Sequence, residues 1–111
     1  MGRMSALMVL FFAAILEAGG DALVRAGLHA PSAWTRAGLL MSGALVLFAY
    51  GCSINLPQWD FGRLLGIYVV FFFVVAQAMS WLIFHQPPTR LVAVGGAFIV
   101  AGGLILSLGA E

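Results

Sequence analysis

Three charged residues, Glu17, Asp21 and Arg25, recur at intervals of four inside the first long apolar stretch of the chain. At helical periodicity this spacing places them in one stripe along a helix. Removing a carboxylate from water favours its protonated form, and the same group attracts cations. A proton and a cation then compete for one site, which is the minimal chemistry of proton-coupled cation export. Glu17 lies deepest in the stretch and is the candidate for this role.

Asp21 and Arg25 also have a purely structural interpretation. Arg25 lies near the expected end of the helix, where its long side chain can extend to the membrane interface. Asp21 is one turn away and is its natural ion-pair partner. The sequence leaves two alternatives open, an ion pair between Asp21 and Arg25 or an Asp21 carboxylate that faces a cavity beside Glu17. A structural role for Glu17 is the corresponding alternative at that position.

The elements that must position these residues follow from composition. Of the 111 residues, 63% are hydrophobic and only 8% are charged, whereas a soluble domain carries about a quarter charged residues. Crossing ~30 Å of hydrocarbon takes ~20 mostly apolar residues. We therefore predict an all-α integral membrane protein, with residues 1–111 forming one transmembrane domain. Its four spans are expected at approximately residues 4–24, 37–52, 64–84 and 91–108.

The arginines are divided almost evenly between the two sides of such a bundle. Arg3 and Arg63 fall on one side, and Arg25, Arg36 and Arg90 fall on the other. Membrane topology follows the Lys/Arg bias of short loops. Two arginines on one side against three on the other do not dictate an orientation, so this sequence is compatible with insertion in either orientation. The expected location is the plasma membrane or the bacterial inner membrane.

The fourth apolar stretch is rich in small residues on two sides. Gly95, Gly102 and Gly109 repeat every seven residues and share one side, while Ala93, Ala97 and Ala101 repeat every four residues on nearly the other side. Small residues let helix backbones approach closely within a membrane. This pattern favours a helix that contacts both its own chain and a second copy. Contact within the monomer only is the alternative.

The third stretch offers Tyr68, Gln77 and Trp81 as candidate cavity residues. Gln77 and Trp81 are four apart and share a face, but Tyr68 is nine residues before Gln77 and points oppositely. The two sets cannot line one cavity of a straight helix. Tyr68 and Trp81 have an alternative role as interfacial aromatic anchors, and Gln77 is the better internal polar contact.

Other chemistries are not indicated by the sequence. His29 and His85 fall in different loops and Cys52 stands alone, so we expect no metal site and no cofactor. Gly19-Gly20 lacks the Lys-Ser/Thr ending of a phosphate-binding loop. The scattered arginines form no nucleic-acid patch. We therefore expect a membrane protein that is not an enzyme and binds no nucleic acid.

The chain resembles the small multidrug resistance family of the drug/metabolite transporter superfamily, and the resemblance covers essentially its whole length. Glu17-Ala18-Gly19-Gly20 is similar to the family's Glu-x-x-Gly, and Gly95-x-x-Phe98-Ile99-x-x-Gly102 resembles its dimerisation motif. Within the family the chain looks closest to the YnfA-like branch. Similar residues follow in order along the chain, namely Ser32-Ala33-Trp34, residues 43–49, Gly62-Arg63 with Tyr68, and Pro88-Thr89-Arg90.

This resemblance implies an antiparallel homodimer in which protons and a small cationic substrate bind alternately at two central glutamates. By carry-over Glu17 is the coupling carboxylate, Gly20 keeps the cavity open beside it, and Tyr68 is a candidate wall residue. The resemblance also implies that the dimer interface includes Gly95, Phe98, Ile99 and Gly102.

Two departures from the family pattern leave other functions open. Asp21 stands where the wider family often has a small hydroxyl residue, and Val69-Val70 stand where the YnfA-like branch tends to have glycines. The leading hypothesis is a proton-coupled exporter of small cationic or toxic compounds. The alternatives are a lipid-linked metabolite translocator and a non-transporting membrane partner subunit.

Overall fold

The structure, a computed structural model, describes residues 2–108, and this range forms four helices without a strand. The helices are α1 (Arg3–Leu28), α2 (Ala33–Ile54), α3 (Phe61–Leu82) and α4 (Arg90–Ser107). Each is long and apolar enough to cross a membrane. The prediction of an all-α fold with four membrane-spanning helices is therefore confirmed.

The helix ends differ from the predicted boundaries where local capping decides them. α1 continues to Leu28 rather than residue 24, because the first helix-breaking residue is Pro31. α2 begins at residue 33 rather than 37, because the Ser32 hydroxyl accepts a hydrogen bond of 3.1 Å from the Thr35 amide. The apolar pattern placed the middle of each helix but not these ends.

The last two helices are shifted by smaller amounts. α3 begins at Phe61, directly after Asp60, and ends at Leu82, so it starts before the predicted residue 64 and stops before residue 84. α4 runs over 90–107 rather than 91–108, and the Thr89 hydroxyl caps it by accepting a hydrogen bond of 3.2 Å from the Val92 amide.

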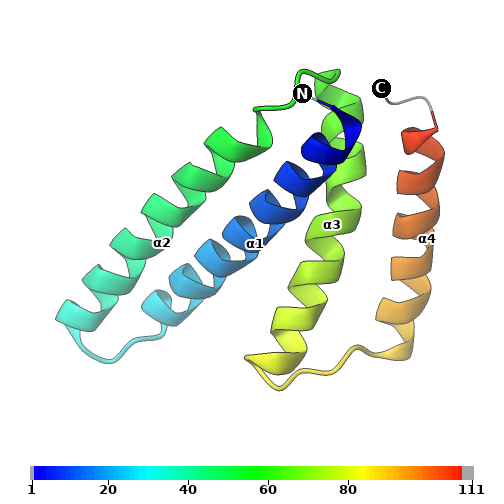
Figure 1. Cartoon of the computed structure of the whole chain (residues 1–111). Coiled ribbons are helices and arrows are strands. Elements are labelled where there is room, and N and C mark those ends of the chain that lie inside the picture. The colour runs from blue at the N-terminus through cyan, green and yellow to red at the C-terminus, as the bar shows by residue number, and fades with distance from the viewer. Residues whose placement is uncertain (1, 109–111) are drawn as a thin grey trace.

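The helices form a chain of pairwise contacts (Figure 1). α1 packs along α2 and against α3, and α4 packs against α3. The N-terminus, the α2–α3 loop and the end of α4 lie at one end of the bundle, and the α1–α2 and α3–α4 turns lie at the other. Toward the second end α1 and α3 diverge. At the first end the Arg3 guanidinium donates a hydrogen bond of 3.1 Å to the Ser107 carbonyl.

Glycines bring α1 and α2 into close contact. A Cβ atom at Gly20 would lie 2.7 Å from the Leu47 side chain, and one at Gly43 would lie 2.7 Å from the Val24 side chain. The same two hypothetical atoms would also meet the backbone oxygen of the opposite glycine, at 3.3 and 3.1 Å. The two backbones cross here at a distance that leaves no room for larger side chains.

A second set of glycines joins α3 and α4. Gly66 of α3 receives the Leu106 side chain, while Gly96 and Gly103 of α4 receive Phe73 and Val70. Val70, one of the two valines that depart from the family pattern, therefore fills the space above a glycine of the neighbouring helix.

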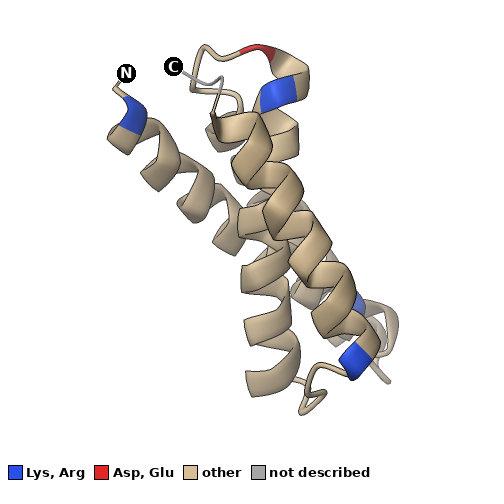
Figure 2. Ribbon diagram, turned by 90° about the vertical axis from the view of Figure 1, so that its right-hand side faces the viewer, with Lys and Arg blue, Asp and Glu red and all other residues tan. Residues whose placement is uncertain are grey.

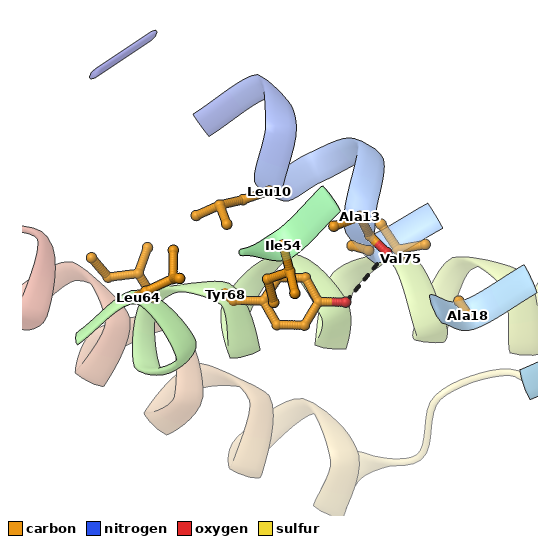
Figure 3. Close-up of a cluster of buried hydrophobic side chains, with 9 residues drawn as sticks. Leu10, Ala13, Ala18, Ile54, Leu64, Tyr68 and Val75 are labelled. Carbon is orange, nitrogen blue, oxygen red and sulfur yellow. Dashed lines mark hydrogen bonds between the residues drawn. The ribbon is translucent and has the colours of Figure 1, made fainter. Parts of the chain in front are cut away.

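The buried core lies where α1, α3 and the end of α2 meet (Figure 3). Its members are Leu10, Ala13, Ala14, Ala18, Ile54, Leu64, Ile67, Tyr68 and Val75. Many large apolar side chains outside this core are exposed, including Trp34 and Phe48 of α2 and Phe98 of α4. Surfaces of this kind suit lipid or another membrane helix rather than water.

Basic residues lie at both ends of the bundle (Figure 2). Arg3 and Arg63 begin α1 and α3 at one end, whereas Arg36 and Arg90 lie near the starts of α2 and α4 at the other. Arg63 forms an exposed ion pair of 3.8 Å with Asp60. The nearly equal number of arginines expected at the two ends of the bundle thus follows directly from the helix arrangement.

Candidate functional site

Glu17 lies near the middle of the longest helix. It is within about 2 Å of the midpoint of α1 along the axis, at a rise of about 1.5 Å per residue. Its side chain is half-buried on the face of α1 that approaches α3. A membrane centred on α1 therefore places this carboxyl group in the hydrocarbon layer, where an ionisable side chain is a candidate functional residue.

Tyr68 of α3 holds the Glu17 carboxyl group. Its hydroxyl donates a hydrogen bond of 2.7 Å to Glu17 Oε1 and lies 3.4 Å from the Ala13 carbonyl oxygen. Figure 3 shows the Tyr68 ring reaching from α3 toward α1, with the contact to Ala13 dashed. A phenol has one proton to donate, and the shorter contact is to the carboxylate. Tyr68 is only 4% exposed, so its orientation is fixed by the core.

Two further aromatic residues extend this wall. The ring centroids of Tyr50 and Tyr68 are 5.8 Å apart, and those of Tyr68 and Phe72 are 6.2 Å apart. Tyr50 is close enough to interact with both the Glu17 carboxyl group and the Tyr68 hydroxyl. Tyr50 is not among the candidate residues predicted from the sequence. Its position seven residues after Gly43, on the side of α2 that packs on α1, is the signal that identifies it.

Asp21 and Arg25 line a cavity of about 240 Å³ between α1 and α3. They do not form the expected ion pair. Within residues 2–108 the ion pair given by the structure is Arg63–Asp60, and the Arg25 guanidinium instead lies 5.3 Å from the centroid of the Phe84 ring. The divergence of α1 from α3 opens space into which the Arg25 side chain extends. Asp21 therefore faces a cavity, but Glu17 is not among its lining residues, so whether Asp21 shares a cavity with Glu17 stays a prediction.

Gly20 does not line this cavity. It is buried against α2, facing Leu47 and the Gly43 backbone. The resemblance implies that Gly20 keeps the cavity of a dimer open, and this role stays a prediction. Its function in the monomer is to allow α1 and α2 to approach.

Gln77 and Trp81 lie away from the Glu17–Tyr68 pair. Gln77 is half-buried on the opposite face of α3, and Trp81 is 57% exposed. Neither lines the cavity that holds Asp21 and Arg25. Within one chain the structure thus brings Glu17 and Tyr68 together and leaves these two residues outside, as their helical spacing requires.

The four residues of the expected dimer interface lie on the outer side of α4. Gly95 and Gly102 have no atom within 4 Å of a hypothetical Cβ, in contrast to the neighbouring Gly96 and Gly103. Phe98 is 76% exposed and Ile99 is half-buried. A groove of about 430 Å³ beside α3 is lined by Phe98, Ile99 and Gly102. α4 therefore presents glycines on two faces, one used by α3 and one open.

Metal chemistry receives no support from the described part of the chain. Among residues 2–108 no three His, Cys, Asp or Glu side chains converge as a metal-binding group. Cys52 is exposed on α2. The Glu17–Tyr68 pair and the cavity lined by Asp21 and Arg25 are the candidate sites considered below.

The fold and the embedded carboxyl group define a multi-pass, four-helix membrane protein. The chain is 36% identical over 104 residues to a UPF0060 membrane protein of Herpetosiphon aurantiacus, an alignment that covers 91% of each protein. The chain therefore belongs to the UPF0060 membrane protein family, in agreement with the YnfA-like branch expected from its sequence. No protein-family model matches the chain, and no solved structure matches it.

Proposed function

We propose that this protein is a proton-coupled exporter of small cationic compounds and that Glu17 is its coupling residue. The single observation that carries the proposal is the Glu17–Tyr68 hydrogen bond of 2.7 Å near the middle of the longest membrane span. Placing a carboxylate in hydrocarbon costs about 2.5–3.5 kcal/mol on insertion scales. A residue this unfavourable, held by a dedicated buried tyrosine, is better explained by function than by stability.

The coupling follows from the chemistry of one carboxyl group. In its ionised form Glu17 attracts a cation and accepts the Tyr68 hydrogen bond. In its protonated form it is neutral and releases the cation. A proton gradient then drives export, because the two ligands occupy the same group in turn and cross the membrane in opposite directions.

Two copies in antiparallel orientation complete the proposed transporter and make it a member of the small multidrug resistance family. Support comes from the open face of α4 with Gly95, Phe98 and Gly102, and from the balanced arginines at the two ends. In this arrangement each copy contributes one Glu17, and exchange between two unequal protomers alternates access. The proposed location is a plasma membrane or bacterial inner membrane.

Transport in proteoliposomes tests the proposal. The purified protein is reconstituted into the membrane of vesicles that contain a pH-sensitive dye. When a gradient of the cation is applied, the vesicle lumen is expected to become more alkaline if the cation enters in exchange for protons, and more acidic if the cation leaves. Glu17→Gln should abolish the signal while the protein still folds. Asp60→Asn is the matched control, because Asp60 is an exposed acidic residue in a loop, and it should transport normally. A proton flux that persists in Glu17→Gln would overturn the proposal.

A further inference from the structure

The cavity between α1 and α3 has the features of a binding site separate from Glu17. Asp21 and Arg25 line it from α1, Phe72 and Ser80 from α3, and Phe84 and Gln86 from the segment after α3. Its volume of about 240 Å³ is slightly below the common range of small-molecule pockets, ~300–1,000 Å³, so it suits a small organic ligand. It lies at the end where α1 and α3 diverge in Figure 1.

A cationic group already occupies part of this cavity. The Arg25 guanidinium lies over the Phe84 ring at 5.3 Å from its centroid, which is the geometry of a cation–π interaction. Asp21, one turn away on the same helix, lines the cavity but forms no ion pair with Arg25 in the described range. The cavity thus offers an aromatic face, now covered by a cation of the chain itself, and a carboxylate.

We propose that this cavity is an access site for the transported cation and that Arg25 is a tethered competitor within it. The inference takes its ligand class from the proposed function and adds a second binding position. Asp21 is displaced from Glu17 by one helical turn, about 6 Å along the axis, toward the end of the bundle. A cation bound between Asp21 and Phe84 therefore lies between the aqueous phase and the central carboxyl group.

The lining selects the kind of cation. Ala18, Ala22 and Phe72 provide apolar contacts, and the Ser80 hydroxyl with the Gln86 side chain supplies hydrogen-bonding atoms 3.3 Å apart. Phe84 favours a planar or alkylated cation that can replace the guanidinium of Arg25 on its face. While Arg25 lies over the ring, its charge offsets that of Asp21. Its displacement leaves the carboxylate to the ligand.

Binding of phenylguanidinium in the Glu17→Gln background tests this site alone, because the central carboxylate is already absent. Titration calorimetry in detergent is expected to give weak binding to Glu17→Gln itself. Adding Arg25→Gln removes the competitor and should tighten binding about tenfold, which lies between the effects of an exposed and a desolvated cation–π contact. Adding Asp21→Asn or Phe84→Leu to that double variant should remove the gain.

Arg36→Gln in the same background is the matched control. Arg36 lies at the same end of the bundle, but its guanidinium donates to the Ala30 carbonyl at 3.0 Å and does not line the cavity. Equal binding by the Arg25→Gln and Arg36→Gln variants would refute the competitor role. A gain that survives Asp21→Asn would refute the site.

A spectroscopic readout keeps the inference testable without changing Arg25. In the Glu17→Gln protein the Arg25 Nε–H resonance should be shifted by the Phe84 ring current, and titration with phenylguanidinium should reverse that shift. A resonance that does not move at ligand saturation would contradict displacement. Because Glu17 is absent throughout, either result leaves the proton-coupled function of the native protein to its own test.

Discussion

The Tyr68 hydroxyl of α3 donates a hydrogen bond of 2.7 Å to the Glu17 carboxyl group of α1, joining two helices across the centre of the bundle. The two residues are 51 positions apart in the chain. Tyr68 is buried among the residues that hold α1 against α3, whereas Glu17 is only half-buried. A rigid donor and an accessible acceptor are the arrangement expected of a ligand-binding carboxylate.

Tyr68→Phe should weaken cation binding without unfolding the protein. The substitution keeps the ring in the core but removes the hydrogen bond to the ionised form of Glu17. Loss of such a charge-assisted bond, about 1.5–3 kcal/mol, predicts a rise of about tenfold or more in the cation dissociation constant at neutral pH. Tyr50→Phe, which keeps the Tyr68–Glu17 bond, should have a smaller effect in the same titration. A larger effect of Tyr50→Phe would reverse the roles assigned to the two tyrosines.

Gly43→Ala should destabilise the contact between α1 and α2. The added methyl group would meet the Val24 side chain at 2.7 Å and the Gly20 backbone oxygen at 3.1 Å. Overpacking of this kind lowers the free energy of unfolding by about 1–3 kcal/mol. Gly51→Ala on the same helix meets no atom within 4 Å and should be neutral or slightly stabilising. Unfolding in a denaturing detergent measures the free energy of unfolding of both variants. Equal values for Gly43→Ala and Gly51→Ala would show that the close crossing is absent.

Leucine substitutions at adjacent glycines of α4 should separate folding from self-association. Gly103→Leu places its side chain against Val70 of α3 and is expected to disrupt the monomer. Gly102→Leu projects from the open face, so it should preserve the helices and weaken the proposed dimer. Helical content by circular dichroism and mass by sedimentation measure the two effects. Intact dimers of Gly102→Leu would place the interface elsewhere.

Additional arginines in one loop should impose one orientation on the chain. Asn55→Arg with Gln58→Arg adds two positive charges to the exposed α2–α3 loop and should retain that loop in the cytoplasm. A reporter fused to the C-terminus is then expected on the cytoplasmic side only. Transport should fall and should recover upon co-expression with a chain biased the other way, such as His29→Arg with Pro88→Arg. Full activity of the singly oriented protein would contradict an antiparallel dimer.

The sequence predicts the spans and the central residue because both depend on local patterns. Four apolar stretches separated by prolines give the fold, and the spacing of Glu17, Asp21 and Arg25 gives their common helix. The family resemblance predicts Tyr68 as a wall residue. Its partner atom could not be known, because the contact depends on how α3 crosses α1.

Which of several possible partners a side chain contacts is less predictable from the sequence than the helical spans are. The spacing of Asp21 and Arg25 allows an ion pair, but Phe84, from the segment after α3, lies near Arg25 and receives its guanidinium. Gly20 packs on α2 because Gly43 lies opposite. In each case a residue distant in sequence decided the outcome. Local spacing carries no information about such contacts.

Proton release from detergent-purified protein tests the central role of Glu17 most directly. Small cationic compounds are added one at a time to the native protein and to Glu17→Gln in weakly buffered solution, over pH 6 to 9. The account predicts release that depends on the compound, saturates with its concentration and disappears in the variant. Cation binding without proton release from the folded native protein, or equal release from Glu17→Gln, would contradict competition at this carboxyl group.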